Sequence, residues 1–338
     1  MIVAVDTGYG YVKALAQDGR RACFPSVVFP DAGTGELVQA VGGSGPGHRV
    51  TLLPAQGEPQ RLLVGDAAIL AGGVRSWDST AAARRDYARL VLAAVAILGV
   101  PGSGPEPEPV DLAVGLPLAS YLQREERRAL RQEMLGLRAR FHVAGKEPGA
   151  MEVRSVRVFA QAVGAYVLAA AAEPAAVAGT VGLVDVGFRT TDYLLVQQTQ
   201  GGALPDEARS GSVDTGIGLA YEGVARMIGG QAGVMVPPGM VEGALASSGT
   251  LTARGRVYDV RSMFETEARA VADRIADQVR RAWGDRMDFL SAALLAGGGG
   301  AATFPHLRGF HPMLRLMEDA FFANAQGFLT LARSAVAV

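Results

Sequence analysis

Two short segments each place a glycine two residues after an aspartate, at the end of an apolar run. Val3-Ala4-Val5 leads into Asp6-Thr7-Gly8, and Leu183-Val184 leads into Asp185-Val186-Gly187. Glycine lets backbone N–H groups approach phosphate oxygens closely, and a strand-end aspartate can hold Mg²⁺, usually through water. Either turn alone is more often a plain hairpin, because Asp and Gly are ordinary turn residues. Two such turns about half the chain apart indicate two similar domains with a nucleotide held between them.

A third glycine-rich segment, Gly297 to Gly300, follows the apolar run 292–296. Consecutive glycines at a strand end allow a flat base or ribose to lie against the backbone. The segment is not a P-loop, because no Lys-Ser or Lys-Thr pair follows it, and no early G-x-G-x-x-G opens a helix as a dinucleotide fingerprint does. Alone it is better explained as a flexible connector; beside the two Asp-Gly turns it indicates a nucleotide site.

The apolar periodicity predicts the elements that must position these turns. Two hairpins are predicted, pairing 2–5 with 11–16 and 181–184 with 193–197, and a smaller hairpin is predicted around Gly255. Further strands are predicted at 49–53, 110–114, 153–158 and 292–296, and helices at about 79–98 (capped by Ser79), 121–137, 160–172, 216–228, 262–283 and 320–332. Residues 33–57 read as a loop-rich insertion and 101–109 as a linker. Strands alternating with helices predict an α/β protein with mixed sheets.

Length and composition exclude several classes of protein. The chain has 338 residues, more than the roughly 250 that one core usually supports, so two domains are expected. Its net charge of −1 argues against a general nucleic-acid binder. A single cysteine excludes an intramolecular disulfide and a Cys-based zinc site, and the four histidines lack metal-ligand spacing. We expect a soluble, cytoplasmic protein, since the N-terminus is unlike a signal peptide and the longest apolar runs are too short to span a membrane.

The combined motifs resemble the phosphate-1, phosphate-2 and adenosine motifs of the actin-type ATPases, a superfamily that includes actin, DnaK-type chaperones and sugar kinases. The motifs are Asp6-x-Gly8-x-Gly10-x-x-Lys13, Asp185-x-Gly187-x-x-Thr190-Thr191-Asp192 and Gly297-Gly298-Gly299. Within the superfamily the chain is most similar to prokaryotic actin-like proteins of the ParM/StbA plasmid-segregation group and their archaeal relatives. The stretches that carry this narrower resemblance are Asp6 to Gly10 with Phe24-Pro25-Ser26, Gly115 to Leu118, Phe188 to Tyr193, and Phe322 to Phe328. It extends from residue 2 to about 332 and is weak in 33–57 and 229–249.

The resemblance implies an actin-like fold, in which two similar α/β domains surround a nucleotide cleft and each carries a small insertion. Domain I would comprise 1–160 and about 312–338, with an insertion at about 31–66. Domain II would comprise 161–311, with an insertion at about 229–290.

The resemblance also implies roles for individual residues. Asp6 and Asp185 would order a hydrated Mg²⁺, and Lys13 would reach a β- or γ-phosphate. Gln161, which follows the strand predicted at 153–158 and lies at the start of the helix predicted at 160–172, would orient the water that attacks the terminal phosphate of ATP or GTP. The remaining predicted nucleotide contacts are Gly8, Tyr9 and Gly10 on one side, Gly187, Arg189 and Thr190 on the other, Gly216 near the ribose, and Gly297, Gly298 and Gly299 at the adenosine.

Several features fall outside this assignment. Ala160 stands where relatives commonly have Pro, and Phe188 where some have Gly. No role is predicted for Phe188 or for Lys146. Lys13 and Lys146 are the two lysines of the sequence. Asn324 and Phe328 are interpreted as packing residues of the last helix. The charged segment 124–131 is interpreted as a solvated helix face, with a filament contact as the alternative.

The function implied is an Mg-dependent ATPase that assembles head to tail into filaments on binding nucleotide and disassembles on hydrolysis. Plasmid DNA would be moved through a DNA-bound adaptor protein, without direct nucleic-acid or membrane binding. Two alternatives remain open: a small-molecule kinase of the same superfamily, and a nucleotide-binding scaffold that does not polymerise.

Overall fold

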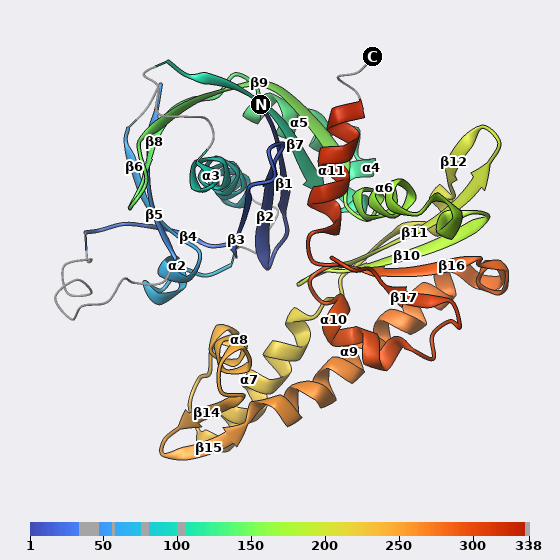
Figure 1. Cartoon of the computed structure of the whole chain (residues 1–338). Coiled ribbons are helices and arrows are strands. Elements are labelled where there is room, and N and C mark those ends of the chain that lie inside the picture. The colour runs from blue at the N-terminus through green and yellow to red at the C-terminus, as the bar shows by residue number, and fades with distance from the viewer. Residues whose placement is uncertain (34–46, 56–57, 76–80, 100–105, 335–338) are drawn as a thin grey trace. The chain divides into compact units, whose positions relative to one another are not determined.

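A computed structural model describes residues 1–33, 47–55, 58–75, 81–99 and 106–334 (Figure 1). The chain divides into two compact units, Met1–Leu168 with Asn324–Val338 (unit 1) and Ala169–Ala323 (unit 2). The predicted cap Ser79, most of the 33–57 insertion and the first part of the 101–109 linker lie outside the described residues. No helix in the described ranges is long and apolar enough to cross a membrane.

Unit 1 is built on a mixed sheet, which has nine strands within the described residues. In spatial order these are β3 (Arg21–Pro25), β2 (Tyr11–Ala16), β1 (Ile2–Thr7), β7 (Glu108–Leu116), β9 (Gly149–Ala160), β8 (Arg138–Val143), β5 (His48–Pro54), β6 (Gln60–Val64) and β4 (Val28–Pro30). The sheet curves around helix α3 (Ala81–Leu98), so that α3 packs against β1, β2 and β3 toward one edge of the sheet and against β8, β5 and β4 toward the other (Figure 1). The outer helices of the unit are α2 (Asp66–Leu70), α4 (Leu118–Leu122), α5 (Arg124–Met134), α6 (Val163–Ala172, which continues into unit 2) and α11 (Ala323–Ser334).

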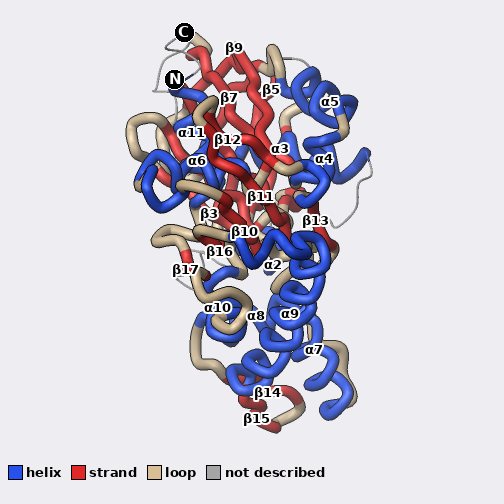
Figure 2. Tube along the Cα trace, turned by 90° about the vertical axis from the view of Figure 1, so that its right-hand side faces the viewer, coloured by secondary structure: helices blue, strands red, loops and turns tan. Residues whose placement is uncertain are grey.

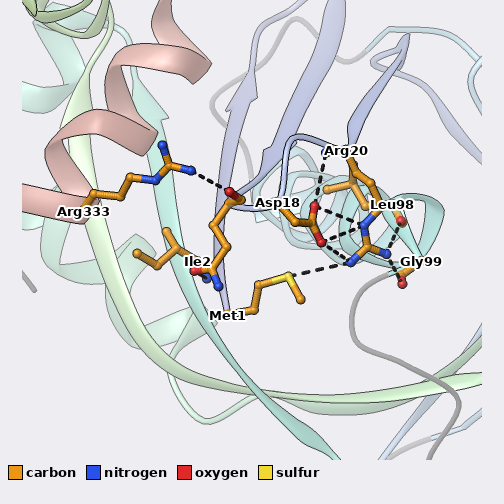
Figure 3. A network of polar contacts seen from close by, with 8 residues as sticks. Met1, Ile2, Asp18, Arg20, Leu98, Gly99 and Arg333 are labelled. Carbon is orange, nitrogen blue, oxygen red and sulfur yellow. Dashed lines mark hydrogen bonds and ion pairs between the residues drawn. The ribbon is translucent and has the colours of Figure 1, made fainter.

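The carboxyl end of α3 is capped by two cations. Arg20 donates to the carbonyls of Leu98 (3.1 Å) and Gly99 (2.6 Å) and pairs with Asp18, as Figure 3 shows. Lys146 donates to the Ile97 carbonyl. Cations at this position donate to the last carbonyls of the helix, which have no partner within it, and interact favourably with the negative end of the helix dipole. Lys146, which had no predicted role, therefore has a structural one.

Unit 2 contains the second mixed sheet, with spatial order β12 (Gly202–Pro205), β11 (Thr191–Thr199), β10 (Thr180–Val186), β16 (Ala292–Ala296) and β17 (Leu314–Leu316); β13 (Gly211–Val213) also pairs with β11. Helices α7 (Gly218–Ala232), α9 (Val260–Trp283) and α10 (Gly300–Leu307) accompany it, and α7 and α9 lie side by side (Figures 1 and 2). Helix α8 (Pro238–Ala246) and the hairpin β14 (Thr250–Ala253) and β15 (Arg256–Asp259) enclose a separate small apolar cluster with α7. Short 3-10 turns lie at Pro174–Val177, Glu207–Arg209 and Gly284–Phe289.

The two sheets share one topology, which confirms the predicted internal repeat. In the order β3-β2-β1-β7-β9, β2 pairs antiparallel with both β3 and β1, whereas β7 pairs parallel with both β1 and β9. The order β12-β11-β10-β16-β17 repeats the same pattern. Asp6 and Asp185 occupy equivalent places near the ends of β1 and β10. The predicted class, two similar α/β domains with mixed sheets, is correct.

Several predicted elements differ from the structure. The helix predicted at 121–137 is two helices, because Gln123 has extended backbone (φ −83°, ψ 108°) between α4 and α5. The helix predicted from 160 begins at Val163, since β9 continues through Ala160. Between the helices predicted at 216–228 and 262–283, where only a small hairpin is predicted, the structure also contains α8, which Pro238 starts and whose Val241 and Ala244 are buried.

Candidate functional site

The first Asp-Gly turn joins β1 to β2 and is held closed by backbone hydrogen bonds. The Gly8 amide donates to the Tyr11 carbonyl (3.1 Å). Ser26 supports the turn from outside, its hydroxyl donating to Gly8 O (2.5 Å) and its amide to Gly10 O (3.0 Å). The Gly8 amide, expected to face phosphate, is thus engaged within the turn. In the sequence, Ser26 belongs only to one of the stretches that carry the family resemblance. The structure shows that it supports the first Asp-Gly turn through these two hydrogen bonds.

Three predicted site residues meet at the end of β1. Lys13 lies directly opposite Asp6 in the β1–β2 register, and its Nζ is 2.6 Å from Asp6 Oδ2. Gln161 Nε2 donates to the other carboxylate oxygen, Oδ1, at 2.7 Å. Asp6 is only 1% exposed, and Lys13 and Gln161 are also buried. A buried carboxylate needs a countercharge and hydrogen bonds. Lys13, on the neighbouring strand, supplies the countercharge, and Gln161, 155 positions away in the sequence, donates a further hydrogen bond.

Gln161 lies in the short connection between β9 and α6. Its amide donates to the Leu116 carbonyl at the end of β7 (2.8 Å), which extends the strand pairing by one residue. Gln161 precedes α6, which begins at Val163, by two residues, whereas the sequence predicts it at the start of the helix. Because the side-chain nitrogen donates to Asp6, Oε1 is the atom of this carboxamide that can accept a hydrogen bond from water.

The second Asp-Gly turn, in unit 2, has the same backbone geometry as the first. The Gly187 amide donates to Thr190 O at 2.9 Å, as the Gly8 amide does to Tyr11 O. Its charges differ, because the residue opposite Asp185 is Asp192 in place of a lysine. Both carboxylates are buried, at 6% and 2% exposure, and the Ser212 hydroxyl donates to Asp192. Carboxylates directly opposite each other share a face of the sheet and favour a nearby cation.

The third glycine segment packs against this second turn. Gly297 has φ +88°, and a Cβ there would lie 2.3 Å from both Asp185 Oδ1 and the Val186 carbonyl. Its amide donates to Ala320 O (2.9 Å), and the Gly299 amide donates to Val186 O (2.8 Å). Glycine at 297 is therefore required by both conformation and space. The structure brings the predicted phosphate-2 and adenosine segments together within unit 2.

Gly216 and Phe188 also belong to this cluster. A Cβ on Gly216 would lie 2.5 Å from the Phe188 carbonyl, so the loop before α7 crosses the turn at van der Waals distance. The Phe188 ring stacks on Tyr221 of α7, with centroids 5.7 Å apart and planes at 16°. Phe188 thus anchors the turn to α7 through its side chain, a role that the sequence left open. Arg189 Nε pairs with Asp214 at 3.1 Å near the surface.

A cavity of about 230 Å³ lies in unit 1 beside the first turn. Thr7, Gly8, Tyr9 and Gln161 are among its lining residues. Tyr87 also lines it, and its hydroxyl donates to the Gly115 carbonyl at 3.0 Å. Burial of the Tyr87 ring raises the pKa of its hydroxyl well above the usual value. Nothing in the sequence pattern singled out Tyr87, because its partner belongs to another element.

The donor set fits a hydrated divalent cation better than a metal held by protein ligands alone. The described residues contain no group of three or more His, Cys, Asp or Glu side chains placed to hold a metal. Each unit instead offers a buried carboxylate at the end of a strand, Asp6 in one and Asp185 in the other. Mg²⁺ typically keeps several waters and binds through one or two carboxylates and substrate phosphates.

Comparison with known proteins agrees with this architecture. Residues 4–164 match the family described as the N-terminal domain of actin-like proteins, and 183–309 match the C-terminal domain of archaeal MreB-like actin homologues. An archaeal actin homolog of Thermoplasma acidophilum is 26% identical over 343 residues, 97% of each chain. A subunit of a 15-stranded ParM filament from Clostridium botulinum superimposes with a TM-score of 0.86 at 20% identity, covering 98% of this chain and 99% of its own. An archaeal actin homolog in complex with ADP gives 0.77 at 21%, with the same coverage.

Repeated sheets with an Asp-x-Gly turn in each define the class of two-domain actin-like proteins. The two family matches together span most of the sequence, one in each half. The chain belongs to the actin-like protein family, and within it is similar to the archaeal actin homologues and to ParM proteins.

Proposed function

We propose that this protein is an ATPase that polymerises on binding nucleotide and disassembles after hydrolysis. The observation that carries the proposal is the buried cluster of Asp6, Lys13 and Gln161 at the end of β1, which joins a carboxylate, a cation and a carboxamide within hydrogen-bonding distance. The equivalent turn in unit 2 supports it, with Asp185 in the same register position. A relative solved with ADP and another solved as a filament lend further support.

Each Asp-Gly turn is proposed to bind phosphate oxygens of the nucleotide. Lys13 carries three N–H donors, so it can donate to a phosphate oxygen while keeping its contact with Asp6. Tyr9 and Gly10 are the candidates for amide contacts from the first turn, and Arg189 and Thr190 for contacts from the second. The glycines at 297–299 lie beside the second turn, which supports a role for them at the adenosine.

Asp6 and Asp185 are the residues proposed to hold Mg²⁺ through its water ligands. When bound, the ion would neutralise charge on the phosphates as the bond to the terminal phosphoryl group breaks. Asp6 is suited to this role because its two oxygens have four lone-pair directions, of which Lys13 and Gln161 take two. The opposed carboxylates of Asp185 and Asp192 suit a site with a cation close by.

Gln161 is proposed to orient the attacking water. Its side chain is fixed through Nε2 on Asp6, which leaves the carboxamide oxygen to accept from a water molecule. A neutral group suffices for this step, since phosphoryl transfer depends chiefly on positioning and electrostatic stabilisation. The cavity lined by Gln161 and by residues of the first turn provides room for water.

Polymerisation is the step that separates this proposal from its alternatives. A head-to-tail contact that does not close on itself produces a filament, and nucleotide binding would favour the state able to make it. Cargo would be plasmid DNA joined through an adaptor protein, consistent with a net charge of −1. A small-molecule kinase or a scaffold without turnover remains the alternative.

High-speed pelleting with negative-stain microscopy distinguishes these functions. We expect filaments with ATP or a non-hydrolysable analogue, and predominantly soluble protein with ADP or without nucleotide. GTP in a parallel sample measures base preference. Protein that stays soluble with every nucleotide at high concentration would contradict the filament proposal, and phosphate transfer to an added small molecule would favour a kinase.

A further inference from the structure

The residue after Gln161 has an unusual backbone conformation. Ala162 has φ +65°, in the left-handed region that alanine rarely adopts. Such a conformation persists only when the surrounding structure enforces it. On the other side of Gln161, the backbone is already fixed by β9 and by the bond to Leu116. The direction of the Gln161 side chain therefore depends on what holds Ala162.

Asn324, 162 residues further along the chain, holds that segment. Its Oδ1 accepts hydrogen bonds from the amides of Ala162 (3.0 Å) and Ala165 (3.2 Å). Ala162 directly precedes α6 and Ala165 lies in its first turn, so neither amide has a backbone partner within the helix. Asn324 is 5% exposed, so no solvent competes strongly for them. One side-chain oxygen thus fixes the left-handed residue and the first turn of the helix.

The helix that carries Asn324 is locked against α6. A Cβ on Gly327 would lie 1.8 Å from the Gly164 carbonyl, so the two backbones are in direct contact. Phe328 is fully buried, and its ring lies over Gly115 and Gly164 and stacks on Phe159 with centroids 5.7 Å apart. The position of Asn324 is therefore set by packing that extends to the end of β7, beside Asp6.

We propose that Asn324 is a positioning residue for ATP hydrolysis, which acts by holding Ala162 so that Gln161 stays directed at Asp6. The inference rests on the catalytic role proposed for Gln161. The effect of Asn324 passes through the backbone of Ala162, whose amide donates to its Oδ1. Packing alone, the role expected from the sequence, would not require an acceptor oxygen at this position.

Phosphate release by the full chain tests this role. Asn324→Ala is expected to lower kcat about tenfold while KM for ATP changes less than about twofold, because orientation is lost and the binding contacts remain. Asn324→Asp keeps an acceptor for both amides and is expected to stay within about threefold of wild-type kcat. In a Gln161→Ala background, Asn324→Ala is expected to cause no further loss, since it acts through the missing side chain.

A matched control separates positioning from loss of a helix cap in general. Asp259 caps α9 in unit 2, where its side chain accepts from the Ser262 amide at 3.1 Å. Asp259→Ala likewise removes a side-chain acceptor from an amide at the start of a helix, here at an exposed site, so it is expected to lower the melting temperature while leaving kcat unchanged. Should Asn324→Ala fail to fold, the Asn324→Asp variant decides the matter: near wild-type kcat supports the inference, and a tenfold loss overturns it.

The outcomes distinguish the two proposals. If Gln161→Ala hydrolyses ATP at the wild-type rate, the catalytic role of Gln161 fails, and the Asn324 inference fails with it. If Gln161→Ala is slow but Asn324→Ala keeps wild-type kcat, only the positioning role of Asn324 is overturned. A further loss in the double variant would also overturn it.

Discussion

Replacing Lys13 by methionine tests whether the Asp6–Lys13 pair is as buried and as coupled as the structure indicates. Methionine fills a similar apolar volume but removes the charge that lies 2.6 Å from Asp6 Oδ2. Asp6, at 1% exposure, would then keep Gln161 as a donor but lose its countercharge. Removing one partner of a buried pair typically costs about 3–5 kcal/mol. We expect about 3 kcal/mol here, because the hydrogen bond from Gln161 remains.

Thermal unfolding followed by circular dichroism measures this cost. A loss of about 3 kcal/mol should lower the melting temperature by roughly 6–12 °C. Asp6→Asn combined with Lys13→Met removes both charges and retains an acceptor for Gln161, so we expect it to recover most of the stability.

Two results would refute this reasoning. One is a Lys13→Met variant that melts within 2 °C of wild type, since a solvated pair contributes only about 0–1 kcal/mol. The other is a double variant no more stable than Lys13→Met, which would mean that the two charges are not coupled.

Three further predictions concern other parts of the molecule. Asp185→Ala should abolish Mg²⁺-dependent phosphate release, and full activity would refute its metal role. Burial, with a smaller effect from Lys146, lowers the pKa of His48 below its ordinary value. As the pH falls, the unfolded chain therefore binds this proton before the folded chain does, and the stability of the fold decreases below about pH 6.5. His48→Phe should flatten the dependence of the melting temperature on pH between pH 7 and 5.5, and an unchanged slope would exclude His48 as its source. Gly327→Ala should destabilise the chain in urea by about 1–3 kcal/mol, because its Cβ would lie 1.8 Å from the Gly164 carbonyl. The matched helical Gly243→Ala has open space and should be neutral or slightly stabilising, so equal losses would contradict the packing argument.

Local patterns predicted the parts of the fold and site that local physics determines. The hairpins at Asp6-Gly8 and Asp185-Gly187 were predicted because apolar runs on either side of a glycine turn specify strand, turn and strand together. Lys13 could be named because it shares a motif with Asp6, and the β1–β2 register then places the two opposite each other.

Contacts between distant segments could not be predicted in the same way. The bond from Gln161 to Asp6 depends on how β9, β7 and β1 are ordered in the sheet, and that order leaves no local signal. Asn324 looked like a packing residue because its partners lie about 160 positions away. Strand β8 and helix α8 were missed for a related reason, since their buried faces are completed by neighbouring elements.

We propose that the Asp6–Lys13–Gln161 cluster links ATP hydrolysis to filament disassembly. Light scattering and phosphate release recorded together after ATP addition test it most directly. For wild type we predict scattering that rises and then falls as phosphate appears, and for Gln161→Ala we predict scattering that rises equally and persists, with phosphate release slowed about a hundredfold. Absence of any ATP-dependent scattering, or decay of Gln161→Ala filaments at the wild-type rate, would contradict the account.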